Sequence, residues 1–309
     1  MKSTISAYEF LKRFPDEKTA RLHLEQRRWH GSPSCPHCGS VERIQTRKVE
    51  GYFRCLSCKN DFTVRTGTIF ERSHVPLDKW LYAIYLLVTS RKGISSMQLS
   101  KEIGVTQKTA WFMLQRLREA CGSGSDGGGM LSGICEADET YIGGKETNKH
   151  ESKKLKAGRG TVGKMAVLGI RQRGGRVKAK VIKSTNKDTI QAAVKSAVEA
   201  GTTLCTDEHA GYRGMPGYGH KVVNHSAKQF VDGMAHTNGI ESVWSVLKRG
   251  FYGVYHQFSE KHLQRYVDEF AYRLNEGRCA IHTLDRIDSL LSKTQGVRLT
   301  YSALKGAAA

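Results

Sequence analysis

The amino-acid sequence predicts a multidomain protein: a small cysteine ribbon and a helical part at the N-terminal end, followed by an α/β domain. Three observations predict this fold class. Residues 31–70 hold four cysteines among turn-forming residues and short β-prone pieces. Apolar residues then recur at helical spacing as far as Ala120, and after a glycine-rich stretch strands alternate with helices. A chain of 309 residues is long enough for about two domains of ordinary size.

The expected segments follow these changes of pattern. The glycine-rich stretch, residues 121–133, holds six glycines in thirteen positions and is typical of a flexible linker. The segments are an N-terminal helical segment (1–30), the ribbon (31–70), a helix-turn-helix-like region (74–121), the linker (122–133), the α/β domain (134–295) and a loose C-terminal tail (296–309).

The charge of the chain indicates the class of its partner. There are 49 Lys and Arg against 29 Asp and Glu, a net charge of +20. Such a balance predicts a polyanion, either nucleic acid or an anionic membrane surface. The longest apolar run, residues 80–89, is far short of the roughly 20 residues of a spanning helix. The N-terminal residues lack the apolar core of a signal peptide. We therefore expect a cytoplasmic protein with no membrane partner and with reduced cysteines.

The four cysteines of the ribbon have the spacing of a zinc site. They form two C-x-x-C pairs separated by 16 residues: Cys35, Cys38, Cys55 and Cys58. Each pair places two thiolates on one tight turn, and two such turns complete a tetrahedral Zn²⁺ site with Zn–S bonds of about 2.3 Å. Four unligated buried thiols are the alternative. A redox C-x-x-C is disfavoured because no βαβ pattern surrounds it.

Residues 96–117 fit a helix-turn-helix. Gly104 permits the turn between the helices, and Thr106 can cap the second one. Three apolar residues would line the first helix: Met97, Leu99 and Ile103. The first residues of the second helix would reach base edges of DNA: Gln107, Lys108 and Thr109. A plain pair of packed helices is the alternative.

Three acids after the linker can form a metal site. Asp138 lies in a β-prone segment, Asp207 ends another, and Glu241 is in the first turn of a predicted helix. Mg²⁺ prefers oxygen ligands, and two ions need one shared carboxylate plus one more acid each. An acid within an apolar strand is also costly to bury without a partner. Three neighbouring acids compete on composition alone, although their amides should keep more activity: Glu136, Glu139 and Glu208.

Together with the ribbon and the helical segment, three later motifs resemble a known family. DETYIGG, TDEHAGY and HTNGIESVWSVLKRGFYG are similar to bacterial insertion-sequence transposases with an N-terminal zinc ribbon and a DDE catalytic domain, the ISXO-like group. The resemblance covers about residues 5–290. It implies an RNase H-like fold with a mixed sheet, in which the first acid is on the first strand, the second follows the fourth strand and the third is on a late helix.

The resemblance also implies site residues. Asp138, Asp207 and Glu241 take the three acid places and would hold two Mg²⁺ or Mn²⁺ ions. Asn238 and His236 are site neighbours, in places where some members of the group have their third ligand. Lys248 follows Glu241 by nearly two helical turns, roughly 10 Å, and would hold a DNA phosphate.

The implied function is DNA transposition. The protein would bind the terminal inverted repeats of its own insertion sequence, cut there, and join the freed 3′-hydroxyls to target DNA. One metal ion would activate the nucleophile and the other would stabilise the leaving oxygen. Residues 145–187 hold fourteen Lys and Arg against two acids, and three lysines among them would grip phosphates: Lys178, Lys180 and Lys183.

Pairing two DNA ends predicts at least a homodimer, associated with the nucleoid when it is bound to DNA. Two alternatives remain open. A regulator could use the ribbon and the helix-turn-helix without the three acids. A nuclease of the same fold would share the metal site without joining strands.

Overall fold

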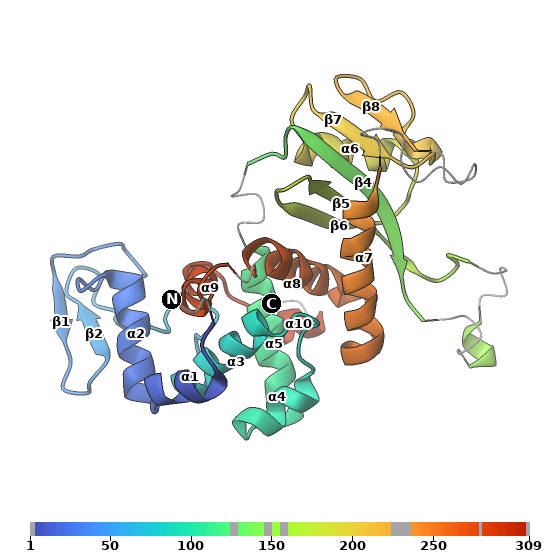
Figure 1. The fold of residues 1–309 in the computed structure, drawn as a ribbon. Coiled ribbons are helices and arrows are strands. Elements are labelled where there is room, and N and C mark those ends of the chain that lie inside the picture. Colours follow the sequence, from blue (N-terminus) through green and yellow to red (C-terminus); the bar gives the residue numbers. More distant parts are fainter. Residues whose placement is uncertain are drawn as a thin grey trace. The chain divides into compact units, whose positions relative to one another are not determined.

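In the computed structural model, the chain divides into two compact units (Figure 1). Unit 1 comprises Met1–Gly124 and Glu276–Ala309, and unit 2 comprises Ser125–Asn275. The structure describes residues 4–123, 129–144, 150–154, 160–223, 236–277 and 280–306. No helix within these residues is both long and apolar enough to cross a membrane.

Unit 1 begins with two capped helices and the ribbon. The elements are α1 (Ala7–Arg13), α2 (Glu17–Trp29) and an antiparallel sheet of β1 (Ile44–Thr46), β2 (Tyr52–Cys55) and β3 (Asp61–Thr63). Asp16 caps α2 by accepting the N–H of Thr19 at 2.7 Å. Trp29 packs edge-on against Phe53 and Phe62, with centroid distances of 5.2 and 5.9 Å. These rings attach α2 to the ribbon.

Three further helices of unit 1 include the expected helix-turn-helix: α3 (Leu77–Thr89), α4 (Ser96–Ile103) and α5 (Gln107–Gly122). Gly104 ends α4 with a φ of +62°, and the Thr106 hydroxyl accepts the N–H of Thr109, as predicted. Met97 does not line α4, because its side chain is 56% exposed whereas Leu99 is fully buried. Two residues apart on a helix point about 200° apart, so they cannot share one narrow face.

The C-terminal part of the chain differs from our expectation. We expected the α/β domain to reach residue 295 and residues 296–309 to be loose. Instead, α9 (Thr283–Ser292) and α10 (Tyr301–Lys305) belong to unit 1. Ile287 and Leu290 are fully buried where α9 contacts α2 and α3, so the helix covers its apolar face within this unit. The backbone then pairs with residues 67–69, the N–H of Gly296 donating to the carbonyl of Gly67 at 2.9 Å.

The expected linker is shorter than the segment 122–133. The helix α5 runs to Gly122, and residues 124–128 lie outside the described part of the chain. Leu131 is fully buried in unit 2, and its N–H donates to the carbonyl of Ala197 at 2.8 Å. The end of the predicted linker is therefore part of the second unit.

Unit 2 is built on a five-stranded mixed sheet with the order β6-β5-β4-β7-β8. Its strands are β4 (Ile134–Ile142), β5 (Met165–Gln172), β6 (Val177–Ile182), β7 (Thr203–Thr206) and β8 (Gly219–Val222). The first three pair antiparallel, and β7 and β8 run parallel to β4. This arrangement is consistent with the RNase H-like domain predicted from the sequence.

Helices pack on both faces of the sheet (Figure 1). The helices of unit 2 are α6 (Lys187–Ala197), α7 (Asn238–Gly250) and α8 (Leu263–Glu276), with short turns at Glu151–Lys153, Ala210–Tyr212, Phe251–Tyr255 and Glu260–His262. On β4, Cys135 and Ala137 share a buried cluster with Ile190 of α6. Because side chains alternate along a strand, Glu136 and Asp138 point to the opposite face, where α7 packs. Both acids therefore face the same helix, α7.

Candidate active site

The parallel pairing of β4 with β7 brings the first two predicted acids side by side. Glu136 lies opposite Cys205 in the register, so Asp138 and Asp207 follow two residues later on each chain segment. Burial raises the pKa of Asp138 to about 7, and the negative charges of Glu139 and Asp207 add to this shift. Three carboxylates therefore repel one another at this end of the sheet.

Trp244 of α7 orients the Asp138 carboxylate. Its indole Nε1 donates to Oδ2 of Asp138 at 2.9 Å, and this bond lowers the pKa against the effect of burial. The helix can approach this closely because Gly169 of β5 has no side chain. A Cβ there would lie 2.4 Å from the Trp244 ring.

Sequence reasoning set aside Glu139, whose negative charge acts on Asp138 although its side chain points to the opposite face of β4. Oε2 of Glu139 accepts a hydrogen bond from the Tyr212 hydroxyl at 2.8 Å, and Oε1 lies 3.6 Å from Nε2 of His209. The N–H of His209 also donates to Oδ1 of Asp207 at 3.1 Å. His209 and Tyr212 both belong to the motif TDEHAGY, which was the available signal for this group.

Glu241, the third predicted acid, is exposed in the first turn of α7. Its Oε1 accepts a hydrogen bond from the Thr237 hydroxyl at 2.8 Å. Trp244 follows it by three residues, so both lie on neighbouring parts of one helix surface. Among the described residues, the four ribbon cysteines are the only group of three or more metal-ligating side chains with ligand atoms within 4.8 Å. The three acids are thus not drawn together to that distance.

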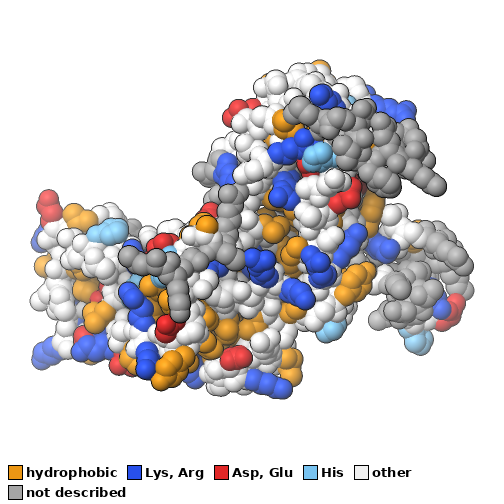
Figure 2. Space-filling view, in the orientation of Figure 1, with side chains coloured by type: hydrophobic (Ala, Val, Ile, Leu, Met, Phe, Trp, Pro, Cys, Tyr) orange, Lys and Arg blue, Asp and Glu red, His pale blue; other side chains and the backbone are white. Residues whose placement is uncertain are grey.

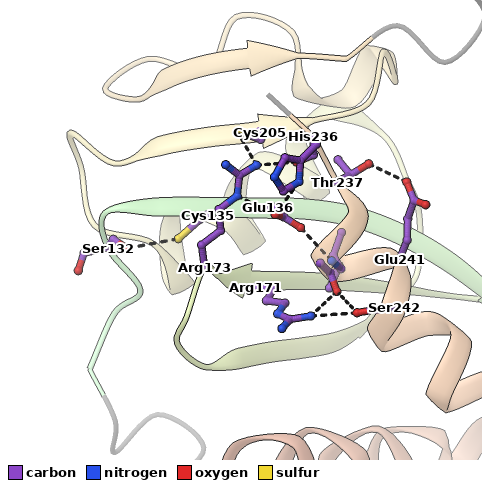
Figure 3. Close-up of polar contacts among 12 residues, drawn as sticks. Ser132, Cys135, Glu136, Arg171, Arg173, Cys205, His236, Thr237, Glu241 and Ser242 are labelled. Atoms are coloured by element: carbon purple, nitrogen blue, oxygen red, sulfur yellow. Dashed lines mark hydrogen bonds and ion pairs between the residues drawn. The ribbon is translucent and has the colours of Figure 1, made fainter. Parts of the chain in front are cut away.

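A buried ionic cluster anchors the start of α7 (Figure 3). Glu136 is 1% exposed, and its Oε2 accepts the N–H of Ile240 at 3.0 Å. Its Oε1 pairs with Nε of Arg173 at 2.8 Å and with Nδ1 of His236 at 3.2 Å. Gly239 makes room, because a Cβ there would lie 2.5 Å from the Glu136 carboxylate. Figure 3 shows Glu241 on the other side of this first turn.

The remaining predicted residues are exposed, apart from the half-buried Lys178 and Thr109. Asn238 opens α7 and Lys248 is in its last turn, and both are exposed. Lys178 and Lys180 are in the edge strand β6, and Lys183 follows it. Gln107 and Lys108 are exposed at the start of α5, and Nε2 of Gln107 donates to the Ser96 hydroxyl at 2.8 Å. Thr109 is half-buried beside its capping partner Thr106. In Figure 2, Lys and Arg outnumber Asp and Glu on the visible face of the described residues.

The pair of Asp138 and Asp207 suits a hard divalent cation. Its donors are carboxylate oxygens, which are the ligands that Mg²⁺ and Mn²⁺ prefer. A cation would also offset the charge repulsion that adds to the effect of burial on the pKa of Asp138. The donor set therefore fits the metal that a DDE domain implies.

The four ribbon cysteines have the geometry of a tetrahedral zinc site. The Sγ atoms of Cys35 and Cys58 lie 3.6 Å apart, as do those of Cys38 and Cys55. Zn–S bonds of about 2.3 Å separate two ligands by roughly 3.8 Å, whereas a disulfide needs about 2.05 Å. The backbone N–H of Cys58 contributes most to lowering the pKa of Cys55 to about 6, which favours the thiolate.

Comparison with known proteins identifies both regions of the chain. Residues 130–275 match the family described as the ISXO2-like transposase domain, and residues 15–61 match the transposase zinc-ribbon domain. The chain is also 30% identical over 253 residues to an uncharacterized protein in transposable element ISH50 of Halobacterium salinarum, covering 77% of this chain and 84% of the relative. The chain therefore belongs to the insertion-sequence transposases that combine a zinc ribbon with an ISXO2-like DDE domain.

Proposed function

We propose that this protein binds the terminal inverted repeats of an insertion sequence, cuts the DNA there, and joins the freed 3′-hydroxyls to target DNA. Membership of the family supports a DNA-acting enzyme with a divalent metal. The finer proposal rests on the register of β4 and β7, which brings Asp138 and Asp207 to the same end of the sheet, and on the contact of Asp138 with Trp244 of α7. Glu241 belongs to the first turn of that same helix.

Each residue has a distinct role in the proposal. Asp138, Asp207 and Glu241 would hold two Mg²⁺ or Mn²⁺ ions, which would activate the nucleophile and stabilise the leaving oxygen. Trp244 holds the Asp138 carboxylate in place. Lys248 and the lysines of the β6 region contact DNA phosphates without reading sequence. At the start of α5, three residues read base edges: Gln107, Lys108 and Thr109.

The proposal includes an assembly and a location. Because joining needs two DNA ends at once, the working form is at least a homodimer. Its partner is double-stranded DNA, which places the protein in the cytoplasm at the nucleoid. The DNA contacts are charge-rich, so binding should weaken steeply with salt.

Amide substitution of the three acids tests the proposal. Asp138→Asn, Asp207→Asn or Glu241→Gln removes a negative ligand and nearly keeps its shape. Cleavage and strand transfer should both fall on the order of a hundredfold or more, because one metal site serves both steps. Binding to inverted-repeat DNA should persist, and Glu208→Gln should keep more activity than the three amide variants.

Two outcomes would change the assignment. If Asn238→Ala abolishes cleavage while Glu241→Gln stays near wild type, the third ligand is one turn upstream. If the wild type nicks DNA but never yields joined products with a 3′-hydroxyl donor, the protein is a nuclease without strand transfer.

A further inference from the structure

Two lysines from distant parts of the sequence lie around one aromatic ring in unit 1. Nζ of Lys108, in the first turn of α5, is 5.0 Å from the ring centroid of Tyr301, and Nζ of Lys305 is 5.6 Å from it. Both distances are within the roughly 6 Å range of cation–π attraction. Phe112, one turn after Lys108 on α5, meets the same ring edge-on at 5.5 Å.

The segment that supplies Tyr301 and Lys305 is held firmly against unit 1. Leu304 is fully buried and Leu299 is 5% exposed. Nε of the buried Arg116 of α5 donates to the carbonyl of Leu299 at 3.2 Å. Thr300 caps α10 by accepting the N–H of Ala303 at 3.1 Å. The position of Lys305 beside α5 is therefore part of the fold.

The arrangement concentrates positive charge beside the expected recognition helix. Lys108 and Lys305 are both exposed, and neither ammonium forms an ion pair among the described residues. A third ammonium, that of Lys79, lies by the turn between α4 and α5, 3.9 Å from where a Cβ of Gly104 would be. Cations held close together without a carboxylate favour an anion near them. Positive charge thus flanks the start of α5.

We infer that α10 belongs to the DNA-binding face of unit 1, with Lys305 holding the phosphate backbone of duplex DNA beside the start of α5, where Lys108 is proposed to reach base edges. This inference rests on the proposed function. A helix in the major groove has a phosphate backbone on each side, and contacts to those phosphates fix its register without reading sequence. The ring of Tyr301 sets the spacing of the two ammonium groups.

Equilibrium binding of the full chain to a short duplex carrying the terminal repeat, measured across salt concentrations, tests the inference. Each phosphate contact adds about 0.9 to the salt slope, so Lys305→Ala should lower the slope by about one and the affinity roughly fivefold near 0.15 M salt. Tyr301→Ala should act in the same direction, whereas Tyr301→Phe keeps the ring and should bind like the wild type.

The matched control is Lys12→Ala, because Nζ of Lys12 lies 4.4 Å over the ring of Tyr8 on α1. This variant removes the same kind of lysine–tyrosine pair and should leave the slope unchanged. A wild-type slope in Lys305→Ala, or an equal loss in Lys12→Ala, would overturn the inference and leave the proposed function standing. If the wild type itself does not prefer the repeat over a scrambled duplex, the proposed function fails as well.

Discussion

The two units are assembled from the chain in different ways. Unit 1 uses both ends of the sequence, whereas unit 2 is one continuous stretch, Ser125–Asn275. The match to the transposase domain ends at residue 275, at the edge of unit 2, and the match to the zinc ribbon covers only residues 15–61. The segment that carries α9 and α10 lies outside both matches.

This difference shows two ways of fixing functional residues in space. In unit 2, hydrogen-bonded sheet register sets Asp138 beside Asp207, and α7 is then anchored above them through Glu136. In unit 1, four cysteines converge within the ribbon, and a returning segment closes the helical core. Disruption of the β4–β7 register or of the α7 anchor should therefore affect unit 2 alone. Disruption of the ribbon or of the returning segment should affect unit 1 alone.

Loss of the zinc site should have the largest effect. Cys55→Ser should release about one equivalent of zinc per chain and unfold the ribbon, since binding energies of roughly 10 kcal/mol or more are folding energies in such sites. Metal analysis and hydrogen exchange of residues 31–70 measure this. Cys121→Ser, which alters a buried thiol of α5 outside the ribbon, should keep the zinc. Full zinc content in Cys55→Ser would contradict the assignment.

Removal of the C-terminal segment should have the next largest effect, a loss of stability in unit 1. A chain that ends at Asn275 loses Ile287 and Leu290 from the core of unit 1, each worth about 2–5 kcal/mol. Hydrogen exchange should show peptides of α3 losing protection while those of β4 and β5 keep theirs. A chain that ends at Gly306 is the control. Equal protection of α3 in both truncations would show that unit 1 does not need the returning segment.

The sequence predicted what is encoded locally. The ribbon cysteines, the turn at Gly104 and the cap at Thr106 each depend on residues close together in the chain, and the structure has the predicted turn and cap. The succession of strands and helices along unit 2 also followed from alternation and from the family resemblance. The sequence did not reveal where α9 packs, because its apolar stripe fits any apolar surface of suitable shape. The burial of α9 against α2 and α3 is determined by tertiary packing and not by the local sequence.

The acids of the site illustrate the same limit. Asp138 and Asp207 could be selected by motif, but the contacts of Glu136 and Glu139 could not be predicted from the sequence. Alternation sends Glu136 beneath α7, and the bend after β7 brings His209 and Tyr212 to Glu139. From composition alone, both glutamates were only alternative candidates for binding the metal.

The anchor of α7 gives the third prediction, and it revises the expectation that a Glu136 amide keeps more activity. Glu136→Gln keeps the acceptor for the Ile240 N–H but removes the buried negative charge that pairs with Arg173. Cleavage should fall roughly ten- to a hundredfold while DNA binding persists, as for residues that orient metal ligands. Glu208→Gln is the matched control. Activity equal in both variants would show that the anchor does not position α7.

The smallest expected effect is a shift in pH dependence. The pKa of Asp138 is raised from 3.8 to about 7, so folding favours its protonated form, and the metal-free protein should lose stability as pH rises from about 4 through about 7. Metal binding needs the carboxylate, so activity at limiting Mg²⁺ should rise with pH over the upper part of that window. Trp244→Phe removes the indole N–H that stabilises the carboxylate, so the pKa should rise further.

The acidic limb of the pH–rate profile should therefore move to higher pH in Trp244→Phe, by about one unit for a hydrogen bond to a charged group. Trp80→Phe is the matched control in unit 1, because its indole N–H donates to the Ser73 hydroxyl at 3.1 Å and not to a carboxylate. That variant should lower stability without moving the limb. If both substitutions leave the limb in place, Asp138 does not set it, and the contact with Trp244 serves packing alone. If both substitutions move the limb equally, the shift reflects a general loss of stability. In that case a change in unit 1 affects the active site of unit 2, and the two units are not independent.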